Sequence, residues 1–125
     1  MKKIKNKISH QDKRGLIIDL LENKKVNSIT FITQKKGKVR GNHIHKNTIQ
    51  WNYVIKGKIE LYTQKKNSST KKTILSKGEI AETSKNEKHA IKALKDSEFL
   101  VFTQGPRGGK NYEKDTFRLL KPLIS

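Results

Sequence analysis

The chain has 125 residues, a length that predicts a single domain spanning residues 1–125. It contains no cysteine, which excludes disulfides and thiolate metal sites. No apolar run approaches the roughly 20 residues that span a bilayer, so we expect a cytoplasmic protein without a membrane segment. The net charge of +18 suggests nucleic-acid binding, but only four of the 29 basic residues are arginine and the lysines are scattered. We therefore expect no nucleic-acid partner, although such a surface would attract a small anionic ligand.

Short apolar runs of period two, separated by polar or glycine breaks, predict strands along the whole chain. The run at residues 15–21 fits a strand or one to two helical turns. Further strands are expected, in chain order, at residues 28–33, 49–57, 58–63, 73–75, 78–83, 89–94 and 98–103. Residues 105–125 form a glycine-rich tail that ends in one last apolar run. About eight short strands and no long helical period predict an all-β sandwich or barrel.

Within residues 49–57, strand alternation separates polar from aromatic side chains. Gln50 and Asn52 are expected on one face, and Trp51 and Tyr53 on the other. An aromatic side chain could stack on a sugar, but this register directs both aromatics away from the polar face. We therefore expect Trp51 and Tyr53 to pack in the core or at a subunit interface.

Two of the four histidines, His43 and His45, lie one residue apart in an expected strand. Residues i and i+2 of a strand point to the same side, so both imidazoles share a face. Such a pair can chelate a metal ion or bracket a substrate, and two ordinary strand-face residues are the alternative interpretation. His10 lies outside this pattern, and we expect it to be solvated on an N-terminal arm.

The spacing around this pair resembles the first motif of the cupin family. It runs over residues 37–57 as glycine, five residues, His43, one residue, His45, four residues, Gln50, six residues and glycine. Gln50 stands where the family usually has glutamate. Residues 78–93 resemble the second cupin motif and place His89 at its histidine position. There Ser84, Asn86 and Ala93 replace the usual proline, glycine and asparagine.

The segments "RGNHIHK" and "GPRGGKNYEKDTFRLL" are similar to those of small cupins in nucleotide-sugar and surface-polysaccharide metabolism. These relatives include sugar ketoisomerases and epimerase-like proteins. The resemblance implies a single-domain jelly-roll β-barrel, a homodimer, and a tail at 105–125 that packs on or closes the barrel. In the ketoisomerases, the two histidines of a similar segment are taken to act as acid and base without a metal, which implies catalytic roles for His43 and His45.

The resemblance also leaves a metal site open. His43, His45 and His89 would supply three nitrogen ligands and Gln50 an amide oxygen. Imidazole-rich sites suit Zn, Fe, Ni or Cu better than Mg or Ca. The expected cofactor is a divalent transition metal, Zn, Fe, Ni or Mn. We favour a bound metal over an empty site.

Candidate substrate-binding residues surround the histidines. Arg40 and Lys46 flank the pair and could hold a diphosphate or stabilise a developing enolate oxygen. The other candidates are Asn52, Arg107 and Tyr112, the last two on a tail that could close over the barrel mouth. The expected function is that of an isomerase or epimerase of a nucleotide-linked or free sugar in surface-polysaccharide biosynthesis. A non-catalytic metal- or sugar-binding cupin with a regulatory or scaffold role is the alternative, and a metal-dependent oxygenase is the second alternative.

Overall fold

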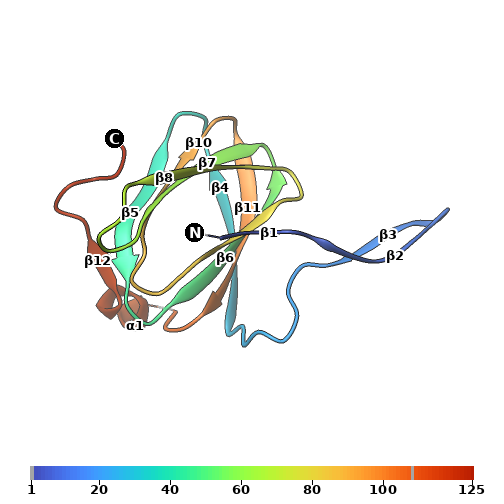
Figure 1. Ribbon diagram of the computed structural model, residues 1–125, viewed down its shortest axis with the longest axis horizontal. Coiled ribbons are helices and arrows are strands. Elements are labelled where there is room, and N and C mark those ends of the chain that lie inside the picture. Colours follow the sequence, from blue (N-terminus) through green and yellow to red (C-terminus); the bar gives the residue numbers. More distant parts are fainter. Residues whose placement is uncertain (1, 108) are drawn as a thin grey trace.

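In the computed structural model, which describes residues 2–107 and 109–125, nearly all regular structure is β (Figure 1). The described strands are β1 (Lys2–Ile4), β2 (Lys7–Asp12), β3 (Gly15–Asp19), β4 (Ser28–Gln34), β5 (Val39–His45), β6 (Ile49–Lys56), β7 (Lys58–Gln64), β8 (Lys71–Ser76), β9 (Ile80–Thr83), β10 (Lys88–Ala93), β11 (Ser97–Gln104) and β12 (Thr116–Arg118). One described helix, α1 (Gly109–Lys114), precedes the last strand. With six residues, it is far too short to cross a bilayer.

Two antiparallel sheets of five strands form the barrel. One has the order β1-β9-β6-β11-β4 and the other the order β12-β5-β10-β7-β8. Most neighbours within a sheet are distant in sequence, as in a jelly roll, where consecutive strands cross between sheets. The all-β jelly-roll prediction is confirmed.

The alternation seen in the sequence fixes which side chains enter the barrel. In β11, every second residue is buried, from Ser97 to Thr103. The apolar inward positions of six strands form one core cluster: Val54, Ile59, Leu61, Leu75, Ala81, Ile91, Phe99 and Val101. Toward one end of the barrel the inward positions are polar. There Gln50 of β6 lies in register with Thr83 of β9 and with Thr103 of β11. The barrel interior therefore has an apolar part and a buried polar part.

The N-terminal segment contains two strands, β1 and β2, that the sequence did not predict. β1 adds to the edge of the first sheet through β9, and among the described strands β2 and β3 pair only with each other. The run at residues 15–21, which fitted a strand or one to two helical turns, forms strand β3 over its first five residues. This β2–β3 hairpin, called the arm below, extends away from the barrel (Figure 1).

A bulge in β5 sets the position of the histidines. Gly41 and Asn42 both have positive φ, at 91° and 58°, and the β5–β10 register shifts beside them. A Cβ atom on Gly41 would lie 3.0 Å from the backbone oxygen of His89, so a larger residue would push the two strands apart. Beyond the bulge, His43 lies directly opposite His89.

Candidate active site

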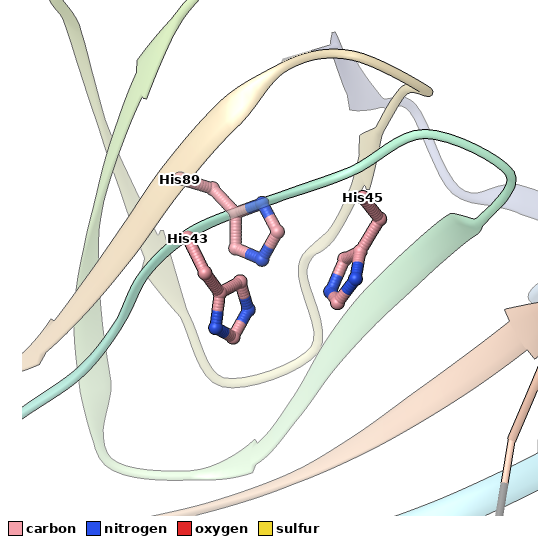
Figure 2. A group of neighbouring side chains, drawn as sticks. All are labelled: His43, His45 and His89. Atoms are coloured by element: carbon pink, nitrogen blue, oxygen red, sulfur yellow. The ribbon is translucent and has the colours of Figure 1, made fainter. Parts of the chain in front are cut away.

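Three histidine rings meet inside the barrel (Figure 2). His43 and His45 come from β5 and His89 from β10. The ring centre of His43 lies 4.6 Å from that of His45 and 4.5 Å from that of His89, and the remaining pair is 5.2 Å apart. One ring nitrogen from each histidine lies within 4.8 Å of the other two. Ile44, between the pair, lines a separate hollow with lysines 65, 66 and 88, as strand alternation requires.

Backbone carbonyls orient two of the rings. The Nδ1 atom of His45 lies 3.1 Å from the carbonyl oxygen of Asp115, and that of His89 lies 3.3 Å from the carbonyl oxygen of Glu87. A carbonyl only accepts, so each Nδ1 carries the proton and each Nε2 keeps a free lone pair. The Nε2 atom of His45 is buried and has no hydrogen-bond partner among the residues that the structure describes. These lone pairs can accept a proton or bind a metal ion.

Burial favours the neutral form of all three imidazoles. Desolvation, followed by the charges of His45 and Arg118, lowers the pKa of His43 from 6.5 to about 4. Desolvation also lowers the pKa of His45, against an opposing effect of Asp115, and lowers the pKa of His89 well below its usual value. The site therefore holds neutral imidazoles at pH 7.

These shifts predict that the metal-free protein loses stability between pH 6.5 and pH 4. The unfolded chain binds a proton on His43 near pH 6.5, whereas the folded chain resists protonation down to about pH 4. The free energy of unfolding should thus be highest above pH 6.5, and His43 alone should remove roughly 2–3 kcal/mol by pH 4, allowing for partial solvent exposure. Urea unfolding of apo-protein measures this, and His43→Gln should flatten the profile while His10→Gln should not.

A pocket of about 570 Å³ opens beside the histidines. His43 and His89 line it, whereas His45 is only 2% exposed and does not line it. The polar side chains around the pocket are amides, guanidinium groups, a phenol, a carboxylate and a hydroxyl: Gln50, Asn52, Arg40, Arg107, Arg118, Tyr112, Glu113 and Thr116. Three cationic side chains against one carboxylate make this pocket suitable for an anionic ligand.

Besides His43 and His89, the structure places five more of the residues singled out from the sequence around this pocket. Gln50 and Asn52 of β6 line it and are almost fully buried, and Arg40 lines it from β5. The guanidinium group of Arg107 lies 4.3 Å above the Tyr112 ring. That ring is in turn 5.2 Å from the ring of His45. The tail thus contributes directly to the pocket wall.

Lys46 lies elsewhere. It does not line the pocket, and its ammonium group lies 4.5 Å from the centre of the Phe117 ring. Ile44 and Phe117 are paired in register across β5 and β12, on the side of the sheet opposite the histidines. Lys46 is next to His45 in sequence, but its side chain belongs to this outer face.

Four residues of the site come from the C-terminal tail and were not predicted. Arg118, Thr116 and Glu113 line the pocket. The fourth, Asp115, is buried, and its carboxylate accepts hydrogen bonds from the backbone amides of Lys46 and Asn47 and from the hydroxyl of Thr48. Pairing of β12 with β5 brings them there. The sequence signal was only a short apolar run after glycines, which does not reveal that pairing.

Comparison with protein families gives a match over most of the chain. The family described as polysaccharide biosynthesis C-terminal domain matches residues 10–117. Among curated proteins, none matches this sequence.

Solved structures share the fold. A dTDP-4-dehydrorhamnose 3,5-epimerase from Sulfolobus tokodaii superposes with a TM-score of 0.75 at 20% identity, over 93% of this chain and 75% of that one. A 3,4-ketoisomerase from Helicobacter canadensis gives 0.74 at 23% identity, over 93% and 86%. A sugar 3,4-ketoisomerase from Thermoanaerobacterium thermosaccharolyticum, in complex with TDP, gives 0.73 at 17% identity, over 95% and 86%. The cupin resemblance deduced from the two motifs is confirmed for the fold.

Proposed function

The chain belongs to the polysaccharide biosynthesis C-terminal domain family, and from this premise we propose that it isomerises or epimerises a nucleotide-linked keto sugar. One observation carries the proposal: a neutral histidine, His43, lines a pocket that also contains the guanidinium groups of Arg40, Arg107 and Arg118. The imidazole can accept a proton from a carbon atom of the substrate, and the arginines can hold a diphosphate. The pocket volume of about 570 Å³ is typical of small-molecule sites.

The reaction we propose is a proton transfer next to a ketone. His43 removes the proton from the carbon beside the carbonyl, and the electrons of that C–H bond move to the ketone oxygen to give an enolate. Delivery of a solvent-derived proton to the opposite face of the same carbon gives an epimer, and His43 releases the proton that it took. If that carbon carries a hydroxyl group, the enolate is an enediolate. Transfer of the hydroxyl proton to the former ketone oxygen, with return of the proton from His43 to the former carbonyl carbon, then moves the ketone by one position. A nearby guanidinium group stabilises the developing oxygen charge.

We assign roles to His45 and to the residues that line the pocket from their positions in the site. The ring centre of His45 lies 4.6 Å from that of His43, and we keep the pair as the proposed acid–base unit. Asn52 and Tyr112 are proposed to position the sugar, and Arg40 and Arg107 to position the phosphates, together with Arg118. Lys46 is left out of this set because it lies on the outer face.

Isotope exchange tests the proposal. The protein is incubated in deuterated water with 4-keto nucleotide sugars, beginning with TDP-linked sugars because similar structures are named for them. We expect deuterium to enter the carbon beside the ketone, as detected by NMR or mass spectrometry. No exchange with any sugar, together with micromolar binding in calorimetry, would favour the non-catalytic alternative. Oxygen consumption that requires added Fe(II) would favour the oxygenase.

The three histidines also fit a metal ion, which is a competing proposal, because a metal ion bound to His43 would occupy the lone pair that the proton transfer needs. The buried, unpartnered Nε2 of His45 and the carbonyl-bound Nδ1 atoms of His45 and His89 match the donor and outer-shell pattern of histidine metal sites. His43 would complete three nitrogen ligands, with Gln50 as an oxygen donor. A divalent transition metal such as Zn²⁺ would act there as a Lewis acid.

If the metal proposal holds in place of metal-free acid–base chemistry, purified, untagged protein should retain close to one equivalent of Zn, Fe, Ni or Mn in elemental analysis. A chelator should then lower the melting temperature, because a ligand bound only to the folded state stabilises it. His89→Asn should abolish both metal content and the chelator effect, whereas His10→Asn should change neither. Metal-free protein with an unchanged melting temperature in added Zn²⁺ would rule out the site.

We further propose a cytoplasmic homodimer in which residues 1–125 form one domain and the tail closes one side of the pocket.

A further inference from the structure

A second hollow, of about 660 Å³, opens on the outer face of the barrel wall that carries the histidines. Ile44 lines it together with three lysines and three side-chain amides: Lys65, Lys66, Lys88, Gln64, Asn67 and Asn86. We call this set the lysine hollow. It is separate from the histidine pocket, with which it shares no lining residue.

The lysine hollow differs from the other hollows of the protein in its charge. None of the described residues that line it is acidic. Four other hollows in the described part of the chain each include at least one carboxylate, from Glu113, from Glu87, from Asp96 and Glu98, or from Asp115. Three cations in one concave site without an acidic neighbour give it a positive potential, which attracts an anion.

Two carboxylates lie near the lysine hollow in the sequence, and both are engaged elsewhere. Glu87 is buried, lines a different hollow and accepts a hydrogen bond from the backbone amide of Ser84 at 3.0 Å. Glu60, on the outer face of β7, lies 3.7 Å from the ammonium group of Lys72. None of the ion pairs among the described residues uses a lysine of the hollow. The positive charge of the lysine hollow is therefore available to a ligand.

Strand pairing and a hydrogen-bonded turn bring the three lysines together. Lys88 of β10 lies in register with Gln64, the last residue of β7, so it is beside the turn that carries Lys65 and Lys66. The backbone amide of Ser68 donates to the carbonyl oxygen of Lys65 at 3.1 Å, and the side-chain amide of Gln64 donates to the carbonyl oxygen of Ser68 at 2.9 Å. The backbone frame of the lysine hollow is thus fixed, while its lysines remain exposed.

The lysine hollow and the histidine cluster lie on opposite sides of the same two strands. Ile44 lies between the two histidines of β5, and Lys88 precedes His89 on β10, so strand alternation points them away from the histidine rings. The backbone amide of Asn86 donates to the carbonyl oxygen of His45 at 2.7 Å. An anion in the lysine hollow would be separated from the substrate pocket by one layer of strand backbone, so both sites can be occupied at once.

We propose that the lysine hollow is a second anion-binding site, which takes a phosphate or diphosphate group. Ammonium groups hold phosphate oxygens as compact point charges, and the side-chain amides around them can donate further hydrogen bonds. Such a group occurs both in small phosphorylated ligands and in the headgroups of anionic lipids, and the experiment has one arm for each source. The inference goes beyond the proposed reaction and does not depend on the sugar chemistry.

Calorimetric titration of the full chain with inorganic diphosphate at low ionic strength is the first arm. We expect two sites in the wild type, one among the arginines of the histidine pocket and one in the lysine hollow. The triple variant Lys65→Gln, Lys66→Gln and Lys88→Gln should weaken the second site by about tenfold or more, because each lost charge reduces the attraction of a multivalent anion. All three lysines are exposed, so the variant should keep its circular dichroism spectrum.

Two further variants separate the sites and control for net charge. Arg107→Gln combined with Arg118→Gln should remove binding in the histidine pocket and leave the lysine hollow unchanged. The matched control replaces three exposed lysines at the opposite end of the barrel, by Lys35→Gln, Lys36→Gln and Lys56→Gln. It removes the same charge as the triple variant of the hollow and should leave both sites intact.

Cosedimentation with vesicles is the second arm, with phosphatidylglycerol mixed into phosphatidylcholine and with phosphatidylcholine alone. Binding to free diphosphate, lost in the triple variant of the hollow, assigns the site to small phosphorylated ligands. Binding only to the phosphatidylglycerol vesicles, lost in the same variant, assigns it to a lipid headgroup. Either result supports the inference.

A triple variant of the hollow that binds diphosphate and vesicles as the wild type does would overturn the inference. Equal losses in that variant and in the matched control would overturn it too, because net charge alone would then attract the anion. The titrations contain no sugar, so their failure would leave the proposed reaction untouched. Absence of isotope exchange would contradict that reaction alone.

Discussion

Replacing His43 by asparagine is expected to slow deuterium exchange into the keto sugar by about 100- to 10,000-fold, the usual contribution of general acid–base help. His43 is the histidine of the pair that lines the pocket, and its neutral state at pH 7 leaves a lone pair for the substrate proton. Asparagine keeps a polar side chain of similar size but cannot accept that proton. The initial rate of exchange, measured by NMR at saturating sugar, gives the effect.

A matched control uses another histidine of the same chain. His10→Asn changes an exposed side chain of the arm and should leave the rate unchanged. The dissociation constant of the sugar for His43→Asn, measured by calorimetry, should stay within a few-fold of the wild-type value, because the arginines remain. A His43→Asn protein that exchanges at the wild-type rate would remove this residue from the proposed mechanism.

His45→Asn should also lower the rate, by a different route. His45 is 2% exposed and does not line the pocket, and its ring centre lies 4.6 Å from that of His43, so we expect it to act on the substrate through His43. Its loss should change the pH profile of exchange as well as the maximal rate, because the environment that sets the pKa of His43 includes His45. An unchanged profile would show that His45 is only a packing residue.

Strand alternation was sufficient to predict the fold and part of the site. Gln50 and Asn52 point into the pocket and Trp51 away from it, as the period-two pattern of residues 49–57 predicts. His43 and His45 share a face for the same reason. His89 was identified by the spacing of the second motif, and the structure places it opposite His43. Local periodicity controls the direction of each side chain, so these features are readable without knowing which strands pair.

Features that depend on long-range pairing were not predictable. The approach of Arg118 and Asp115 to the site requires β12 to pair with β5, about seventy residues earlier in the chain. The N-terminal strands contain many lysines and few apolar residues, so they lack the pattern of a buried strand. Lys46 was assigned to the site because it follows His45, yet adjacent strand residues point to opposite faces. The proximity of Lys46 to His45 in the sequence was therefore misleading, and strand alternation alone predicts that their side chains point to opposite faces.

Asp115→Ala is expected to destabilise the protein by about 3 kcal/mol. The carboxylate accepts hydrogen bonds from the backbone amides of Lys46 and Asn47 and from the hydroxyl of Thr48, so it joins the tail to the β5–β6 loop. Burial alone would raise the pKa of Asp115, but these hydrogen bonds outweigh burial and lower it. Alanine would leave several donors without a partner, each at a cost of about 1 kcal/mol or more. Urea unfolding at pH 7 measures the change.

The control for this prediction is Thr48→Val, which removes one hydrogen bond to the same carboxylate and should cost about 1 kcal/mol. The two variants should also differ in their effect on the site. The carbonyl oxygen of Asp115 accepts the Nδ1 proton of His45, so loosening the tail frees that ring to rotate or change tautomer. We therefore expect Asp115→Ala to shift the His45 ring resonances in NMR and to reduce isotope exchange at least tenfold, with Thr48→Val close to the wild type in both. Equal unfolding energies for the wild type and Asp115→Ala would mean that the tail is held by its strand pairing alone.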